Sequence, residues 1–347
     1  MRTGLRLLGV QTVGPPGGAE ITFLRLARRL VDRGWAVELA TPEPGPLDDA
    51  DLRVHRLAVG GLDRRAGAAA VAAWPRTRAL ARRFDVVYLN GTVAGRLLPA
   101  LAGRRTVLHA HDMVDRVPPH WRLASTVLVP SRAVAGRMLG LHPHVVGCPV
   151  ELDVEPSPAP PWPPGEGPVI GFVGRIEPRK GPLDLVHAAP AIRAGAPGAR
   201  VVIVGDDPYA RDPAHLMAVR RGEGVEQYGW APDAPALLGH LDVLVAPSHQ
   251  EPFGTVLAEA MAAGTPVVAT RVGGLADTVD DGRTGLLVEP GRPDLLAAAV
   301  LEVLARRDEM GAAARAWAQR FGADAYADRV EALLRRLAAR GSNNVPL

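Results

Sequence analysis

Cysteine is almost absent from this sequence, and long uncharged apolar runs are missing. Cys148 is the only cysteine, which excludes a disulfide framework and a zinc site built from thiolates. No stretch of about 18 apolar residues is free of charges, so we expect no transmembrane helix. Residues 1–10 lack the apolar region and cleavage site of a signal peptide, and we interpret them as a strand. These absences predict a soluble, cytoplasmic protein.

Lysine is nearly absent as well. Of the 40 basic residues only Lys180 is a lysine, in a chain rich in alanine, arginine, glycine and proline. This bias indicates a GC-rich bacterial source. Lysine offers a compact ammonium on a flexible stem, which suits a point contact with a phosphate oxygen. The alternative is that one lysine has survived by chance on the surface.

The length and the proline pattern predict two domains. A chain of 347 residues exceeds one ordinary domain of about 100–200 residues. Residues 156–165 contain six prolines in ten positions, which excludes a helix or central strand and is typical of a stiff linker. We therefore expect a first domain over residues 1–152, a linker over 153–167 and a second domain over 168–321.

Charge is unevenly divided between these parts. Residues 1–150 hold 21 arginines against 11 acidic residues, a balance of +10, whereas the rest of the chain has a balance of −7. The asymmetry fits two domains with different partners, of which the first faces something anionic.

Short apolar runs alternate with longer amphipathic patterns on both sides of the linker. Near-continuous apolar runs suit parallel strands buried on both faces. The alternation predicts an α/β fold of two doubly wound, Rossmann-like domains facing a cleft, with ligands at the carboxyl ends of the strands. The expected strands are Leu5–Val10, Ala36–Thr41, Asp85–Asn90, Thr106–His111, Thr126–Ser131, Val145–Val150, Val169–Gly174, Arg200–Gly205, Val225–Trp230, Val243–Ser248, Pro266–Thr270 and Gly285–Glu289. The expected helices are Ala19–Arg33, Pro182–Ala194, Thr255–Ala263, Pro293–Arg306 and Ala323–Ala339.

Two groups of residues follow strands of the first domain. Gly17 and Gly18 precede a helix, where glycines let backbone amides approach an anion; a tight turn is the alternative. His109, His111 and Asp112 end a later strand. A histidine there can donate to a substrate hydroxyl or phosphate, and the alternation of a strand places both histidines on one face. A structural histidine and a capping aspartate are the alternatives.

Two cations follow the first strand of the second domain. Arg175 and Lys180 lie five residues apart in a strand-to-helix loop. So placed, they would hold a diphosphate and neutralise the charge that develops on it as a leaving group.

Two glutamates flank the start of a helix further along the chain. Glu251 precedes the helix, whose first amides, near Gly254–Val256, are unpaired and can bind a phosphate. Glu259 lies eight residues on, about 12 Å away by helical rise. One carboxylate would then accept from sugar hydroxyls and the other from ribose hydroxyls. A helical glutamate is usually solvated, but Glu259 has apolar neighbours and needs a partner.

These segments resemble glycosyltransferase family 4, in the expected order over nearly the whole chain. The matching residues are Gly17-Gly18, Gly174-Arg175, Lys180-Gly181, Glu251, Phe253-Gly254, Glu259, Gly264–Val267 and Gly282–Val288. The resemblance implies a retaining enzyme of the GT-B fold, whose final helix, near residues 322–340, crosses back onto the first domain. It also implies that no metal or other cofactor is needed, because Arg175, Lys180 and helix amides replace a divalent cation.

The resemblance further implies a role for each matching residue. Arg175 and Lys180 would bind the donor diphosphate, Glu259 the ribose and Glu251 the transferred sugar, while His111 lies near the anomeric carbon. The implied catalytic residues are Glu251, His111, Arg175 and Lys180. The implied donor-binding residues are Gly18, Arg175, Lys180, Gly205, Gly229, Trp230, Glu251, Phe253, Gly254, Thr255, Val256 and Glu259. Among these, Gly18 would close the cleft, and Gly205 and Tyr228-Gly229-Trp230 would border the nucleobase.

The sequence departs from the family in two places. Pro149–Asp153 stands where the family often has Asn-Gly-Val-Asp, and the linker is unusually rich in proline. Both departures concern the hinge more than the chemistry. Asp49 and Asp51 have the spacing of a DxD metal motif, but they lie in a loop rich in proline and acid, and we interpret them as solvated.

The leading hypothesis is a transfer of a hexosyl group from a UDP- or GDP-linked sugar to an acceptor hydroxyl of a glycolipid, glycan or secondary metabolite. A GT-B-fold sugar-nucleotide epimerase and a non-catalytic nucleotide-sugar-binding protein are the alternatives. No nucleic acid is expected as a partner.

Basic residues also gather in the expected acceptor domain. The cluster comprises Arg64, Arg65, Arg76, Arg78, Arg82 and Arg83, around the apolar stretch Ala68–Trp74. Such a surface would attract an anionic acceptor or the inner face of an anionic membrane. The alternative is a solvated helical face, and Pro75 would break any long amphipathic helix.

Overall fold

The computed structural model describes residues 4–11, 17–42, 52–57, 59, 64–207 and 212–339. The chain divides into two compact units. Unit 1 consists of Met1–Pro149 with Ala323–Leu347, and unit 2 consists of Val150–Gly322. The first boundary, expected at residue 152, lies at Pro149, and the proline-rich residues 153–167 fall inside unit 2.

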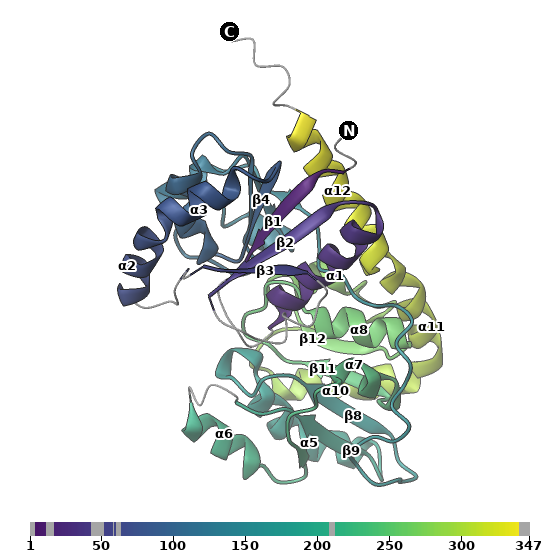
Figure 1. The fold of residues 1–347 in the computed structure, drawn as a ribbon. Coiled ribbons are helices and arrows are strands. Elements are labelled where there is room, and N and C mark those ends of the chain that lie inside the picture. Colours follow the sequence, from purple (N-terminus) through teal and green to yellow (C-terminus); the bar gives the residue numbers. More distant parts are fainter. Residues whose placement is uncertain are drawn as a thin grey trace. The chain divides into compact units, whose positions relative to one another are not determined.

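Unit 1 contains a seven-stranded parallel sheet in the order β3-β2-β1-β4-β5-β6-β7 (Figure 1). Its strands are β1 (Arg6–Val10), β2 (Ala36–Thr41), β3 (Arg53–Arg56), β4 (Val86–Asn90), β5 (Thr106–His109), β6 (Thr126–Val129) and β7 (His144–Val145). The sequence did not predict β3, because this edge strand carries three polar residues and only one apolar one, Val54. From β1 the chain adds β2 and β3 on one side of the sheet and then β4 to β7 on the other, so the strand order switches between β1 and β4.

Helices cover both faces of this sheet. They are α1 (Gly18–Asp32), α2 (Arg64–Ala72), α3 (Trp74–Ala81), η2 (Ala94–Leu101), η3 (Pro119–Leu123), α4 (Arg132–Ala135) and α12 (Ala323–Ala339). Phe23 of α1 and Tyr326 of α12 are buried in one core cluster with Leu7 of β1. Figure 1 shows the C-terminal α12 running beside α1. Glu331 of α12 accepts from Trp35 Nε1 at 2.9 Å and pairs with Arg33, so the final helix belongs to unit 1.

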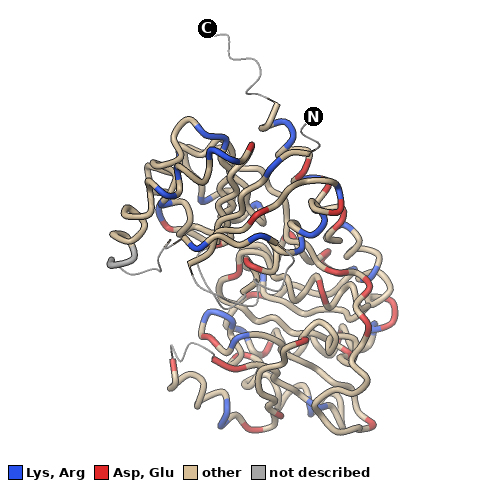
Figure 2. The backbone as a smooth tube through the Cα atoms, in the orientation of Figure 1, with Lys and Arg blue, Asp and Glu red and all other residues tan. Residues whose placement is uncertain are grey.

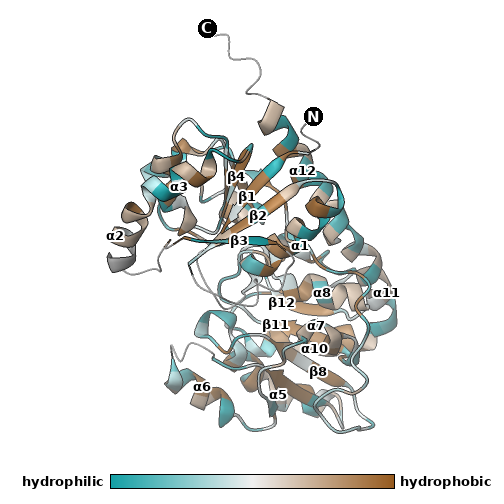
Figure 3. Cartoon of the chain, in the orientation of Figure 1, coloured by the Kyte–Doolittle hydropathy of each residue, from teal (hydrophilic) through white to brown (hydrophobic). Residues whose placement is uncertain are grey.

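Unit 2 contains a six-stranded parallel sheet in the order β10-β9-β8-β11-β12-β13. Its strands are β8 (Val169–Val173), β9 (Arg200–Val204), β10 (Glu226–Tyr228), β11 (Val243–Ala246), β12 (Val267–Thr270) and β13 (Gly285–Val288). Here the order switches between β8 and β11, and a doubly wound sheet binds its ligands at such a point. Figure 3 shows strands of this sheet in the brown of hydrophobic residues, as expected of strands buried on both faces.

The helices of unit 2 are η4 (Pro178–Lys180), α5 (Pro182–Gly195), α6 (Pro213–Arg220), α7 (Ala234–Leu237), η5 (Leu238–His240), α8 (Thr255–Ala263), α9 (Leu275–Thr278), α10 (Pro293–Ala305), α11 (Arg307–Ala318) and η6 (Gln319–Phe321). Leu185 of α5 and Val300 of α10 are buried with Ile170 of β8 in one core cluster. Two doubly wound, Rossmann-like units are therefore confirmed.

The proline-rich segment packs on unit 2. Ser157 donates its backbone N–H to Ala236 O at 2.9 Å and accepts from His240 Nε2 at 2.7 Å. Trp162 is 5% exposed, and its ring lies 5.9 Å from that of Tyr228. The segment is therefore anchored at both ends, unlike a free linker.

The chain crosses between the units twice, and the two crossings start from adjacent points of unit 2. Val150 and Gly322 form an isolated parallel bridge, and the Val150 N–H donates to Phe321 O at 2.9 Å. The expected strand Val145–Val150 is thus divided into β7 and this bridge. Among the described residues, no helix is long and apolar enough to span a membrane.

Candidate functional site

The only lysine of the chain contacts the first of the two predicted glutamates. Lys180 ends η4 in the loop after β8, and Glu251 lies in the loop after β11. Their Nζ and Oε2 atoms form an ion pair, with side chains 19% and 11% exposed. Because β8 and β11 are neighbours at the switch point, the fold brings together two residues that are 71 positions apart.

Backbone contacts lock the two loops together. His249 and Gln250 donate their backbone N–H groups to Arg179 O at 2.8 and 3.2 Å. Gly181 adopts φ 67°, and a Cβ there would overlap the carbonyl oxygen of Pro247. Only glycine fits this position, which directly follows Lys180. The backbone from which the Lys180 side chain extends is therefore held against the loop that carries Glu251.

Arg175 lies at the start of the loop that ends with Lys180, and a buried glutamate orients it. Glu177 forms an ion pair with Arg175, with 2.8 Å between Oε1 and Nη1, and accepts a hydrogen bond from Arg179 Nε at 2.7 Å. Its side chain is 8% exposed. Sequence reasoning missed Glu177, since a lone glutamate between two arginines has no motif of its own. Arg175 and Lys180 are both placed after β8, as predicted.

Residues that follow β12 hold the loop that carries Glu251. Gly274 N–H donates to Glu251 O at 2.8 Å, and the Thr278 hydroxyl donates to Phe253 O at 2.7 Å. Gly273 packs so tightly on Glu251 that a Cβ there would overlap its carbonyl oxygen. Phe253 itself is 4% exposed and forms an edge-to-face contact with Phe321, so its role in the structure is to pack the loop.

Helix α8 begins directly behind this loop. Gly254 is its N-cap with φ 89°, and a Cβ there would overlap the Leu275 side chain. Thr255 and Val256 are the first helical residues, so their N–H groups have no partner within the helix. Glu259 lies half-buried in the helix between the buried Ala258 and Ala260. The structure thus places an ammonium, a carboxylate and a helix N-terminus along one edge of the sheet.

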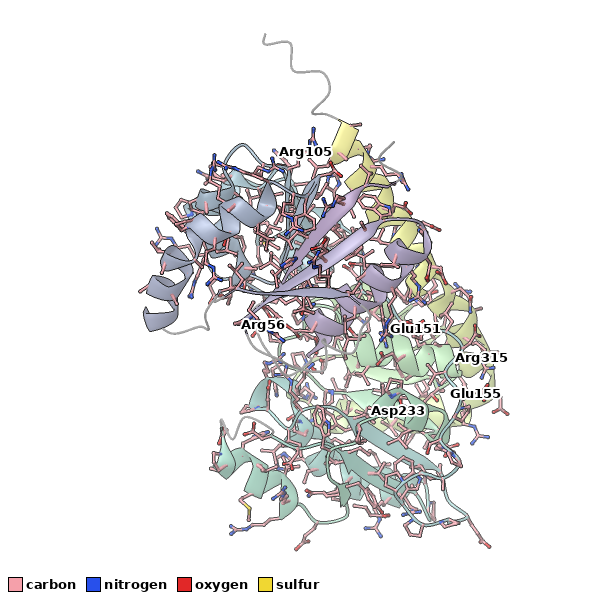
Figure 4. The ribbon with its side chains drawn as sticks, in the orientation of Figure 1. Arg56, Arg105, Glu151, Glu155, Asp233 and Arg315 are labelled. Carbon is pink, nitrogen blue, oxygen red and sulfur yellow. The ribbon has the colours of Figure 1, made fainter. Side chains whose placement is uncertain are left out.

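The predicted nucleobase residues border a separate pocket of unit 2. A cavity of about 560 Å³ is lined by Tyr228, Gly229, Trp230 and part of the proline-rich segment. Trp230 is 55% exposed. Figure 4 labels two acidic residues of the lining, Glu155 and Asp233. Gly205 lies at the start of this region, where it packs against the Gly174 carbonyl and donates to Tyr228 O at 3.0 Å.

In unit 1, Gly18 is the first residue of α1. The preceding Gly17 N–H donates to Glu20 Oε2 at 2.8 Å, which caps the helix. Among the residues that the structure describes, nothing lies within 4 Å of a Cβ built at Gly18. Residues 12–16 of the glycine-proline loop, and the predicted Asp49 and Asp51, lie outside the described residues.

His109 and His111 lie on the same face of the sheet, as predicted. Their ring centroids are 3.8 Å apart. His109 Nδ1 is 2.7 Å from the Tyr88 hydroxyl, and His111 Nε2 is 2.7 Å from Asn90 Oδ1. Desolvation by the surrounding protein lowers the pKa of His111 to about 3, so the ring is neutral at physiological pH. Asp112 is 3.5 Å from the Thr92 hydroxyl, at the surface.

A fully buried amide lies at the same edge of this sheet. Gln11 directly follows β1, and among the described residues neither of its side-chain amide atoms has a partner. Sequence reasoning missed Gln11, Tyr88 and Asn90. Side chains alternate between the two faces along a strand, so Tyr88 and Asn90 of β4 share one face. Since β4 pairs with both β1 and β5, this pattern could have brought them to the histidines.

Two family models match the chain. "Glycosyltransferase Family 4" matches residues 16–154, and "Glycosyl transferases group 1" matches residues 167–306. The chain belongs to glycosyltransferase family 4. The predicted family is thereby confirmed.

Curated relatives of this chain come from bacteria. A D-inositol 3-phosphate glycosyltransferase of Segniliparus rotundus is 35% identical over 258 residues, which are 71% of this chain and 52% of that protein. A GDP-mannose-dependent alpha-(1-6)-phosphatidylinositol monomannoside mannosyltransferase of Mycobacterium tuberculosis is 39% identical over 169 residues, 44% of this chain and 43% of that protein. The chain spans about half the length of the curated relatives it matches.

Solved structures show the same fold. Anabaena HepE in complex with UDP-glucose has a TM-score of 0.78 and 23% identity, covering 96% of this chain and 100% of that one. The sucrose-phosphate synthase of Thermosynechococcus elongatus has a TM-score of 0.80 and 25% identity, covering 97% and 100%. The GT-B fold is therefore confirmed.

Proposed function

We propose that this glycosyltransferase moves a hexosyl group from a nucleoside-diphosphate sugar to an acceptor hydroxyl, with retention of the anomeric configuration. The observation that carries the proposal is the contact between Lys180 and Glu251 beside the N-terminus of α8. It joins a phosphate-binding cation to a carboxylate that accepts from sugar hydroxyls. UDP-glucose in HepE and the GDP-mannose dependence of a relative support a nucleotide-sugar donor.

The charges of the site account for the leaving group. An ammonium has three N–H donors, so Lys180 can hold Glu251 with one and diphosphate oxygens with the others. Arg175 and the amides of Thr255 and Val256 add positive potential. As the bond from the anomeric carbon to the phosphate oxygen breaks, its electron pair goes to the diphosphate, which these groups stabilise. The acceptor oxygen attacks on the same face, and its proton passes to the leaving oxygen.

The other roles follow from position. Glu251 would hold the transferred sugar and Glu259, further along α8, the ribose. Gly205 and the pocket at Gly229 and Trp230 would receive the nucleobase. From unit 1 we assign Gly18 to the donor phosphates and His111 to the sugar. In this proposal Arg175 and Lys180 supply the charge that a metal ion would supply elsewhere. Among the described residues no group of three or more histidine, cysteine and acidic side chains has the arrangement of a metal site.

A donor panel tests the proposal. Incubation with UDP- and GDP-sugars plus acceptor alcohols, in the presence of EDTA, is expected to release nucleotide only when acceptor is added. Proton NMR of the product is expected to show the anomeric configuration of the donor. Clean inversion would contradict retention, and loss of transfer in EDTA would contradict the absence of a metal ion from the reaction. Isomerisation of the sugar without acceptor would contradict glycosyl transfer itself.

The acceptor side is proposed to be a basic surface of unit 1, which attracts an anionic acceptor. Figure 2 shows basic residues recurring over this unit, α3 among them. Arg76, Arg82 and Arg83 are exposed. Arg78 is exposed too and donates to Ala100 O at 3.0 Å. Trp74 donates to Arg96 O and packs on the core. The side chains of Arg64 and Arg65 lie outside the described residues, and the helix breaks between α2 and α3, as Pro75 predicted.

Vesicle binding tests this surface. The protein is expected to co-sediment with anionic but not neutral vesicles at low salt, because exposed cations attract an anionic surface. Binding should fall at high salt, where such attraction is screened, and in the Arg76→Ala/Arg82→Ala/Arg83→Ala variant. Equal recovery in the supernatant would exclude the membrane and favour a soluble anionic acceptor.

A further inference from the structure

The environment of His111 decides which of its nitrogens carries the hydrogen. Asn90 ends β4 and contacts two partners with its side-chain amide. Its Nδ2 lies 3.0 Å from Ala19 O, in the first turn of α1, and its Oδ1 lies 2.7 Å from His111 Nε2. A carbonyl oxygen can only accept, so the atom facing Ala19 must be the amide nitrogen. The amide oxygen then faces His111.

This orientation leaves one tautomer for the imidazole. An amide oxygen only accepts, so His111 Nε2 must carry the hydrogen that it donates to Asn90. The ring is neutral, and Nδ1 therefore holds a lone pair. His109 packs against the ring of His111, and its Nδ1 lies on the Tyr88 hydroxyl. In the described part of the chain, it forms no hydrogen bond with either nitrogen of His111. Asn90 alone among these contacts sets the tautomer.

We propose that Asn90 is a positioning residue of this glycosyltransferase, which holds His111 as the Nε2-protonated imidazole and ties that ring to the first turn of α1. The proposal rests on the proposed function, because it concerns the histidine assigned to the sugar. It changes the expected role of that histidine: with Nε2–H committed to Asn90, His111 accepts a hydrogen from a sugar hydroxyl through Nδ1 and does not donate one.

The position of Asn90 explains why one residue can serve both partners. In unit 1 the strand order switches between β1 and β4, so the loop after β1 leads into α1 on one side of Asn90. His111 follows β5 on the other side, since β5 pairs with β4. Gly18, which we assign to the donor phosphates, is adjacent to Ala19. Asn90 thus connects the two parts of unit 1 that we assign to the donor.

Nitrogen NMR of histidine-labelled protein tests the tautomer without any substrate. The His111 resonances, identified by their loss in His111→Gln, are expected to show a protonated Nε2 and an unprotonated Nδ1 at pH 7. A protonated Nδ1, or a doubly protonated ring, in the unaltered protein would overturn the proposal.

Variants separate positioning from folding. Asn90→Leu removes both contacts of the amide and is expected to abolish the preference for the Nε2 tautomer. It is also expected to lower kcat by about 10²-fold with little change in KM, because it misplaces the imidazole. Asn90→Asp keeps the acceptor and adds a charge, so it is expected to make His111 protonated at neutral pH. Tyr88→Phe, which removes the neighbouring contact to His109, is the matched control and should leave the His111 tautomer unchanged.

The outcomes are distinguishable. An Asn90→Leu protein that keeps both the Nε2 tautomer and the kcat of the unaltered protein contradicts the positioning role. If that variant does not fold, the Asn90→Asp spectrum still decides, because an uncharged His111 beside the new carboxylate contradicts the contact. Failure of glycosyl transfer in the donor panel, with the predicted tautomer present, would overturn the proposed function and leave the assignment of the tautomer supported.

Discussion

Replacing Lys180 with alanine is expected to lower kcat/KM by about 10²–10³-fold, the range for losing one preorganised charge-stabilising group. The ammonium is held on Glu251 before any donor binds, so the loss removes a group that needs no reorganisation during the reaction. Steady-state kinetics with the donor found in the panel measure the change. Lys180→Arg is expected to remain impaired, since a planar fork does not fit the site of a point charge that is 19% exposed.

A double variant separates catalysis from stability in this experiment. Lys180→Ala leaves the Glu251 carboxylate, 11% exposed, without its cation, which costs about 1–3 kcal/mol of folding stability. Lys180→Ala/Glu251→Gln removes the orphaned charge and is expected to recover much of that loss in thermal unfolding, while activity stays low. Unchanged turnover in Lys180→Arg would show that the single lysine is an accident of composition.

The sequence predicted Lys180 and Glu251 as separate residues, and the structure adds their contact. Each stood out for a local reason: Lys180 as the only lysine, Glu251 as an acid before a helix. Their pairing depends on β8 lying next to β11, and local periodicity predicts strands but not their order. The resemblance to the family supplied roles for both residues without supplying this ion pair.

The supporting residues were harder to predict. Glu177 and Asn90 are ordinary polar residues in loops or at strand ends, and nothing in their spacing marks them. Glu177 matters because two arginines converge on it, and Asn90 because α1 and the β5 loop both reach it. Such roles arise from tertiary contacts, so they are visible only once the fold is known.

The elements themselves were largely predictable. Buried parallel strands such as Arg200–Val204 are nearly continuous apolar runs, which is a strong signal. The misses were elements with weak patterns. Arg53–Arg56 is a mostly polar edge strand, and Arg307–Ala318 is a second helix that follows α10 after a single residue. The proline-rich segment was predicted as a linker because proline excludes regular structure, but irregular backbone can still pack, as Ser157 and Trp162 do.

Gly181→Ala is expected to lower both stability and activity, although the substitution adds only a methyl group. The residue has φ 67°, and its new Cβ would overlap the backbone oxygen of Pro247, which no side-chain rotation relieves. Left-handed strain costs about 1–2 kcal/mol, and the overlap adds to it. A total of about 2–4 kcal/mol corresponds to a fall in Tm of roughly 5–10 °C. The displaced loop carries Lys180 away from Glu251, so kcat/KM should fall by at least about 10²-fold.

Gly198→Ala is the matched control for this prediction. Gly198 also has a positive φ, 84°, but the nearest atom to a Cβ built there is 3.7 Å away, an ordinary contact. It precedes β9, so it lies at the amino ends of the strands, whereas Lys180 follows the carboxyl end of β8. The control variant carries the strain without the overlap, so it should lose about 1 kcal/mol and keep its activity below its own Tm. Calorimetry and initial rates at a temperature where both variants are folded measure the difference. Equal activity in the two variants would show that the contact between the loops does not position Lys180.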